Sequence, residues 1–260
     1  LPAEKKARYK EINEELSNLT SKYSENVLDA TSAWSKQIDE EALLAGLPDS
    51  AKGLARQTAE QRGMDGWLLT LDVPCYQPVM AYADNRDLRF ELYQAFGTRA
   101  SDQGPDAGKW DNSEQMERIL ALRHEQAQLL GFASYAERSL ATKMARSPEQ
   151  VLEFLNDLAS RSVTQARNEL AEVEAFSREH HGVDRIEPWD LSYYAEKLRQ
   201  HRYQISQEEL RPYFPVDRVL PGMFAVVERL FSIRIQEVTD FDRWHEDVKF
   251  FEIRGADGHL

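Results

Sequence analysis

Apolar residues recur every three or four positions along most of this chain, the spacing of one face of an α-helix. The first stripe predicts one helix of about ten turns, and its apolar positions are Ile12, Leu16, Leu19, Tyr23, Val27, Ala30, Trp34 and Ile38. Proline, glycine and capping residues divide the rest into further predicted helices, at 40–47, 50–63, 77–83, 84–100, 112–131, from 134, 147–182, 190–203, 206–213 and 217–231. The predicted fold class is mainly α, a multi-helix body with long helices.

Several of these helices have recognisable starts. Asn112 stands before one of them as an N-cap, and Ser134-x-x-Glu137 and Ser147-x-x-Gln150 are capping boxes for two more. The last of these helices is long and ends before a glycine; its apolar positions are Val151, Phe154, Leu155, Leu158, Val163, Leu170, Val173 and Phe176.

Strand character is confined to short segments. Residues 67–72 are β-rich and stop before Pro74, which predicts a short strand. Residues 233–238 and 248–254 predict the beginning of a small sheet at the C-terminal end. We therefore predict a helical body at 1–232 and a β segment at 233–260.

The final strand runs into Gly255-Ala256-Asp257-Gly258, a hairpin turn signal, and the sequence stops two residues later. A hairpin without its return strand leaves a row of backbone donors and acceptors unpaired. We therefore expect the sequence to be an internal piece of a longer chain. A disordered tail that contains Asp-Gly is the alternative.

Charge and composition argue against several classes of function. The net charge of −13 argues against a nucleic-acid or anionic-membrane surface. No apolar run reaches the roughly 18–20 residues of a membrane span. The single cysteine, Cys75, has no partner for an intrachain disulfide, which favours a reducing compartment. We expect a cytoplasmic protein that binds neither nucleic acid nor membrane.

His124-Glu125 lies in the middle of a predicted helix and is the most tempting catalytic candidate. A zinc peptidase helix has the pattern His-Glu-x-x-His, because residues four apart share a face and two imidazoles then bind one ion. Here the second ligand position is Gln128, a poor zinc ligand. A solvated helix face is the favoured interpretation, and we reject a metal site.

The remaining chemistry-bearing residues are equally uninformative. His180 and His181 precede a helix C-terminus, where the helix dipole favours cationic side chains, so capping is favoured over chelation. Neither carboxylate nor cysteine stands at ligand spacing from His201, His245 or His259. Cys75 is interpreted as a small buried hydrophobe. We predict no catalytic and no metal-binding residue in this chain.

Large aromatic residues could line a groove or fill the core, and the core is favoured. They are Trp34, Trp67, Trp110, Trp189 with Tyr193 and Tyr194, and Trp244.

Several longer motifs together resemble the thimet oligopeptidase family of zinc metallopeptidases. One of them is Thr98-Arg99-Ala100-Ser101-Asp102. The similar stretches run in order along essentially the whole chain, at Gly66–Pro74, Tyr76–Met80, Tyr93–Asp102, Gly104–Asn112, Ile119–Phe132, Ser139–Ala145, Pro188–Asp190, Leu210–Pro215 and Trp244–Glu252.

The resemblance implies a mostly helical fold with a deep, narrow channel, in which members of the family hydrolyse short peptides but exclude folded proteins. In that family zinc is bound by a His-Glu-x-x-His helix and a downstream Glu, and the motif Glu activates the metal-bound water. The resemblance places all of these groups beyond Leu260. The parent protein is expected to be a monomeric, cytoplasmic zinc oligopeptidase, and the substrate-binding residues in this chain are left unassigned.

Two hypotheses follow. The first is a fragment of a zinc-dependent oligopeptidase that is inactive by itself and binds no zinc. The second is a free-standing helical module that binds peptides or a partner without catalysis.

Overall fold

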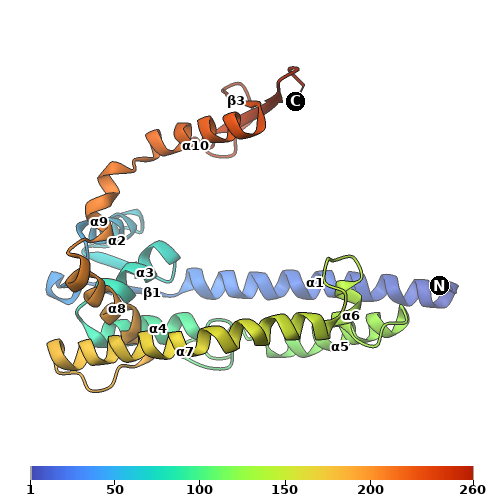
Figure 1. Ribbon diagram of the computed structural model, residues 1–260, viewed down its shortest axis with the longest axis horizontal. Coiled ribbons are helices and arrows are strands. Elements are labelled where there is room, and N and C mark those ends of the chain that lie inside the picture. The colour runs from blue at the N-terminus through green and yellow to red at the C-terminus, as the bar shows by residue number, and fades with distance from the viewer. Residues whose placement is uncertain (1, 260) are drawn as a thin grey trace. The chain divides into compact units, whose positions relative to one another are not determined.

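The computed structural model describes residues 2–259, and in that range helices dominate, as predicted (Figure 1). The α-helices are α1 (Ala3–Ala33), α2 (Asp49–Gln61), α3 (Val73–Tyr82), α4 (Arg86–Gly97), α5 (Ser113–Leu129), α6 (Tyr135–Leu140), α7 (Pro148–His181), α8 (Pro188–Tyr203), α9 (Gln207–Leu210) and α10 (Val216–Phe231). Two 3-10 helices are η1 (Glu41–Leu44) and η2 (Arg211–Tyr213). The strands are β1 (Ser35–Ile38), β2 (Trp67–Thr70), β3 (Ile233–Val238) and β4 (Phe250–Gly255).

The chain folds as two compact units, Leu1–Arg202 and Tyr203–Leu260. The first unit holds the long helices and the β1–β2 sheet, and the second holds α9, η2, α10 and the β3–β4 sheet. The division into domains at 1–232 and 233–260 stays a prediction. In the part of the chain that the structure describes, none of the helices combines the length and apolar character that a membrane crossing requires.

The helix α1 packs along α5 (Figure 1), and polar as well as apolar groups stabilise this contact. Arg8 Nε lies 2.6 Å from Glu125 Oε1. Further along, the buried Asn26 donates a hydrogen bond of 2.9 Å from Nδ2 to Asn112 Oδ1. Asn112 occupies the predicted N-cap position of α5, but its side chain does not cap the helix because it is used to contact α1.

The prediction of one helix through Ile38 is wrong. Helix α1 ends at Ala33, Trp34 takes an extended conformation, and β1 follows. The strands β1 and β2 pair antiparallel, and Ile38 stands opposite Trp67. Ile38 is 2% exposed. It is apolar because strand β1, rather than a continuation of the helix, places it in the hydrophobic core.

The main hydrophobic core lies where β1, β2, η1, α2, α3 and α4 meet. The predicted strand at 67–72 is confirmed for Trp67–Thr70, all four of whose residues are buried. The core cluster consists of Ile38, Leu44, Leu47, Ala55, Trp67, Leu69, Val79, Ala83, Leu88 and Leu92.

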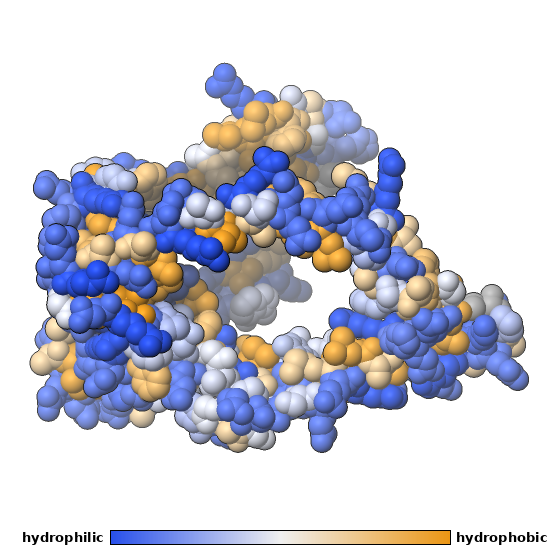
Figure 2. Space-filling model, turned by 60° about the horizontal axis from the view of Figure 1, so that its bottom comes forward, coloured by the Kyte–Doolittle hydropathy of each residue, from blue (hydrophilic) through white to orange (hydrophobic). Residues whose placement is uncertain are grey.

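Both predicted ends of α7 are confirmed. Ser147 accepts a hydrogen bond from the Gln150 backbone N–H, and Gly182 ends the helix in the left-handed region at φ +67°. The apolar stripe, however, is buried only near the C-terminal end of α7, at Val173 and Phe176. Leu155 is 51% and Leu158 47% exposed. Apolar patches between hydrophilic residues are visible on the face of the molecule drawn in Figure 2.

The second unit is built from α10 and a two-stranded sheet. Strand β3 pairs antiparallel with β4 from Ile233 opposite Gly255 to Val238 opposite Phe250, which confirms the predicted small C-terminal sheet. The Phe224 and Phe251 rings, 4.9 Å apart, connect α10 to β4. The turn after β4 forms as well, with the Gly258 N–H donating to the Gly255 carbonyl at 2.9 Å.

Candidate functional site

The rejected zinc candidate on α5 is engaged in other contacts. Glu125 accepts hydrogen bonds from Arg8 at 2.6 Å and 2.8 Å, and this guanidinium holds the pKa of Glu125 below its ordinary value. Gln128 donates from Nε2 to the Ala133 carbonyl at 3.0 Å. Among residues 2–259, no three His, Cys, Asp or Glu side chains form a group able to hold a metal ion.

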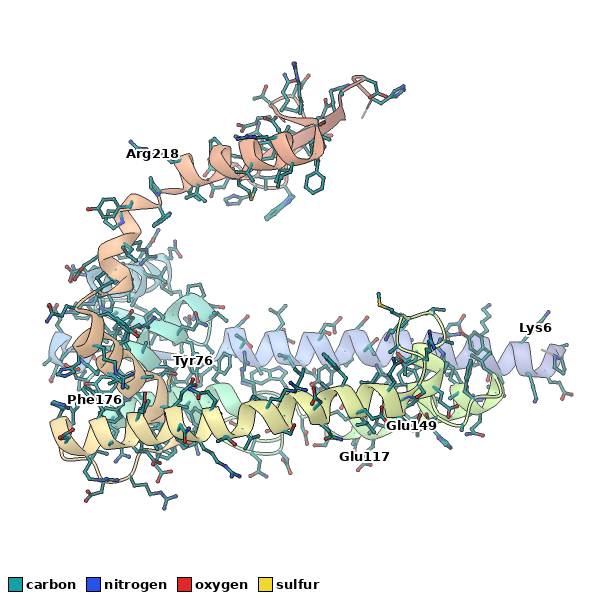
Figure 3. All side chains as sticks on the ribbon, viewed as in Figure 1. Lys6, Tyr76, Glu117, Glu149, Phe176 and Arg218 are labelled. Carbon is teal, nitrogen blue, oxygen red and sulfur yellow. The ribbon has the colours of Figure 1, made fainter. Side chains whose placement is uncertain are left out.

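Three histidines converge on one phenylalanine at the C-terminal end of α7. Phe176, labelled in Figure 3, has ring-centroid distances of 4.7 Å to His180, 5.5 Å to His181 and 5.5 Å to His201. Sequence reasoning treated His201 as isolated, because only the packing of α8 on α7 brings it near the other two. Burial and, after it, the nearby Lys197 lower the pKa of His181, which favours its neutral form. The three histidines therefore pack around the Phe176 ring rather than forming a metal site.

Cys75 is unsuited to nucleophilic chemistry. Its sulfur accepts a hydrogen bond from the Thr70 backbone N–H at 3.3 Å. Burial raises the pKa of the Cys75 thiol, which keeps it protonated at neutral pH.

The aromatic residues singled out from the sequence do not form one groove. Trp67, Tyr193 and Tyr194 are buried in the first unit, whereas Trp244 in the second unit is 88% exposed. Trp189 differs from both groups. It is half-buried, and its ring lies 4.7 Å from Phe90 and 5.9 Å from Tyr93.

Around Trp189 the structure assembles a half-exposed strip of rings, which we call the aromatic row. Its members come from α3, α4 and α8 and are Tyr76, Phe90, Tyr93, Phe96 and Trp189. Tyr76, labelled in Figure 3, stacks on Phe96 at 4.1 Å with an interplanar angle of 16°. Burial and the neighbouring Tyr93 raise the pKa of Tyr76, so its hydroxyl stays neutral and can donate a hydrogen bond.

The helix α4 explains how the row arises from the sequence. Leu88, Leu92 and Ala95 step by four and three residues and are buried in the core. Phe90, Tyr93 and Phe96, spaced by three, follow the flank of the same helix. Tyr93 and Phe96 are therefore half-exposed, whereas the residues of the inner stripe are buried.

A buried ion pair fastens α8, and with it Trp189, to α4. Asp190 is fully buried and accepts hydrogen bonds from Arg89 at 2.8 Å and from Arg86 at 2.6 Å. Arg89, 1% exposed, also donates to the Trp189 carbonyl at 3.2 Å. Burial by itself would raise the pKa of Asp190, but the hydrogen bonds from Arg86, the Glu187 N–H and Arg89 hold it below the ordinary value.

At the end of the aromatic row, Arg99 lines a small pocket of about 10 Å³. The pocket is lined by Ala30, Trp34, Leu71, Ala95, Thr98, Arg99, Pro105 and Asp106. Arg99 Nε donates to the Phe96 carbonyl and Nη1 to Thr31 Oγ1, each at 2.8 Å. Its guanidinium carbon lies 3.6 Å from the centroid of the Phe96 ring, so the cation is held on three sides.

The pocket's other wall is a closed loop at 101–111. The Asn112 N–H donates to the Ala100 carbonyl at 3.1 Å, which joins the two ends of the loop. Gly104 adopts φ +82°, and a Cβ at that position would lie 1.9 Å from Thr98 Oγ1. Glycine is therefore required where the loop packs against the end of α4.

The aromatic row and Arg99 offer three kinds of contact to a ligand: stacking on apolar rings, hydrogen bonds from neutral tyrosine hydroxyls, and one immobilised positive charge. Sequence reasoning missed Arg99 and the row. The spacing of Phe90, Tyr93 and Phe96 was a usable signal, but the contribution of Thr31 and the loop depends on packing between segments distant in the sequence.

Comparison with known proteins completes the description. The model of Peptidase family M3 matches residues 79–260. Over 260 residues the chain is 56% identical to oligopeptidase A of Escherichia coli, covering 100% of this chain and 38% of that relative. It is 53% identical over 253 residues to oligopeptidase A of Haemophilus influenzae, an alignment that covers 97% of this chain and 37% of that relative. It is 33% identical over 255 residues to the dipeptidyl carboxypeptidase of Escherichia coli, and this alignment covers 97% of this chain and 37% of that relative.

Proposed function

This chain belongs to peptidase family M3, and from that premise we propose that it forms part of the peptide-binding framework of a zinc-dependent oligopeptidase. The family match over residues 79–260 carries the proposal, and the resemblance to the thimet oligopeptidase family agrees with it. The chain spans about 38% of the length of oligopeptidase A of Escherichia coli, so the activity of a whole enzyme is part of the proposal.

The proposed contribution of this chain is a wall of the channel that receives short peptides. The aromatic row supports this role, because half-exposed rings stack on apolar side chains while the hydroxyls of tyrosines bind backbone groups. The parent protein is proposed to be cytoplasmic and monomeric.

Zinc does not fit the donors of this chain. Glu125 is paired with Arg8, Gln128 is an amide, and in the described range no three suitable donors come together. We therefore assign no zinc ligand here and derive no catalytic step. The proposal places metal binding and water activation on residues outside this sequence, and this chain alone is expected to be inactive.

Two measurements test this proposal. The 260-residue polypeptide is assayed on an internally quenched fluorescent oligopeptide, and its zinc content is determined by elemental analysis. We expect neither cleavage nor stoichiometric zinc. Turnover together with tightly bound zinc would contradict the proposal that the zinc ligands and the catalytic residues lie outside this sequence. The longer gene product, assayed in parallel, is expected to cleave the peptide and to lose activity with a chelator.

The second candidate function is a non-catalytic module that binds peptides or a partner protein. The half-exposed aromatic row favours it, because such a surface needs no metal to bind a peptide. The coding sequence downstream of Leu260 separates the two. A reading frame that continues into His-Glu-x-x-His supports the peptidase, and a stop codon supports the binding module.

A further inference from the structure

We propose that Arg99 binds the free α-carboxylate of a short peptide whose preceding side chains lie on the aromatic row. The inference rests on the proposed peptide-binding function and adds to it a particular residue, a particular chemical group and a direction for the bound chain.

The first support is the way Arg99 is held. Two of its nitrogens are fixed by hydrogen bonds of 2.8 Å to Phe96 O and Thr31 Oγ1, and its plane lies on the Phe96 ring. Nη2 makes no hydrogen bond within the range that the structure describes. A guanidinium immobilised before binding loses little side-chain entropy when it binds a carboxylate.

The second support is the missing counter-charge. Arg86 and Arg89 share the carboxylate of Asp190, whereas Arg99 enters no ion pair with the described residues. Burial lowers the pKa of Arg99 from its ordinary value, the effect expected for a partly desolvated cation that enters no ion pair with the described residues. An incoming carboxylate would supply this charge and gain a charge-assisted hydrogen bond.

The third support is the lining of the pocket, which favours a singly charged group. Asp106 lies on its wall and would repel a phosphate dianion more strongly than a carboxylate. The remaining lining is mostly apolar, and at about 10 Å³, roughly the space of one water, the pocket admits a single small group such as a carboxylate oxygen rather than part of a folded partner.

The fourth support is continuity with the aromatic row. The Arg99 guanidinium lies on the Phe96 ring, and Phe96 stacks on Tyr76 at 4.1 Å, so the cation adjoins two rings of the row. From there Tyr93, Trp189 and Phe90 extend the surface, with ring-centroid distances of 5.9 Å and 4.7 Å at Trp189. A peptide anchored at its C-terminus would place its apolar side chains along this strip.

The test compares two ligands that differ only at the C-terminus. The probes are an acetylated tetrapeptide with aromatic side chains, as the free acid and as the amide, titrated into the 260-residue chain by isothermal calorimetry. We expect the acid to bind about tenfold more tightly, which corresponds to about 1.4 kcal/mol for one charge-assisted contact.

Substitutions test whether Arg99 causes the preference for the free-acid peptide. Arg99→Gln should abolish the preference for the acid, and Arg99→Lys should reduce it. Arg123→Gln is the matched control, because Arg123 is also half-buried, lies 4.9 Å from the Tyr135 ring and enters no ion pair with the described residues. It should keep the full preference. Circular dichroism verifies that each variant is folded.

Three results would overturn the inference: equal binding of acid and amide, a preference that survives in Arg99→Gln, or equally effective displacement by inorganic phosphate alone. Failure here is distinguishable from failure of the proposed function. If the longer gene product cleaves peptides while acid and amide bind alike, only the role of Arg99 is refuted.

Discussion

Replacing Asp190 with asparagine tests the contact that holds α8, and therefore Trp189, on α4. Asp190 is fully buried, and Arg89 beside it is 1% exposed, so the substitution leaves a buried cation without its anion. Removing one partner of a buried ion pair costs about 3–5 kcal/mol of unfolding free energy. Arg86 is 47% exposed and can turn to water, which places the expected loss near the lower end of that range.

The loss should depend on pH in a defined direction. The folded state holds the pKa of Asp190 below its ordinary value, so this carboxylate stabilises the fold above its unfolded pKa of about 3.9. That stabilisation is lost as the pH falls through the lower, folded pKa. The difference in unfolding free energy between the wild type and Asp190→Asn is therefore largest near pH 7 and shrinks below about pH 4.

Urea unfolding followed by tryptophan fluorescence at pH 7 and pH 3.5 measures both effects. The control is Asp157→Asn, which removes an exposed ion pair with Arg161 on α7 and should change stability by less than about 0.5 kcal/mol. The reasoning is refuted if both variants lose the same small amount at pH 7. It also fails if the deficit of Asp190→Asn is as large in acid as at neutral pH.

Two further predictions concern the loop and the long helices. Gly104→Ala should be more destabilising than Gly108→Ala by about 1–3 kcal/mol, because both glycines have positive φ but only a Cβ at 104 meets Thr98, and thermal melting measures the difference. Leu122→Ala in the contact region of α5 should lower stability by about 2–5 kcal/mol, since Leu122 is fully buried. Leu158→Ala should change it by less than about 0.5 kcal/mol, since Leu158 is 47% exposed; equal losses in urea unfolding would contradict the described burial.

Signals that act over a few residues predicted the elements well. The capping boxes at Ser134 and Ser147 depend on a side chain and a backbone N–H three residues away, and both hydrogen bonds are present. Strand β3 begins and ends where its β-branched pattern does. Asn112 shows the limit of such signals. Its cap position is right, but its side chain bonds to Asn26 because burial against α1 offers a partner that the local sequence does not contain.

Apolar periodicity identifies which positions favour burial without identifying what covers them. On α1 the spacing runs past Ala33 to Ile38, although the backbone changes from helix to strand between them. On α7 the same kind of stripe is largely exposed in the described structure, and only Val173 and Phe176 near its end are buried. Periodicity therefore predicts an amphipathic segment, and its partner must come from tertiary structure.

Local sequence signals could not predict the candidate site either, because its residues come together only through tertiary packing. Arg99 is held by Thr31 from α1 and by Phe96 from the end of α4, and it lines the same pocket as Asp106 of the 101–111 loop. No residue of this set is unusual in its own segment. The chemistry arises because packing brings an arginine that enters no ion pair with residues 2–259 to the end of a row of rings. A resemblance that covers the whole chain identifies the family, because it sums many weak local constraints. It does not identify this cation, whose environment depends on the packing of three separate segments.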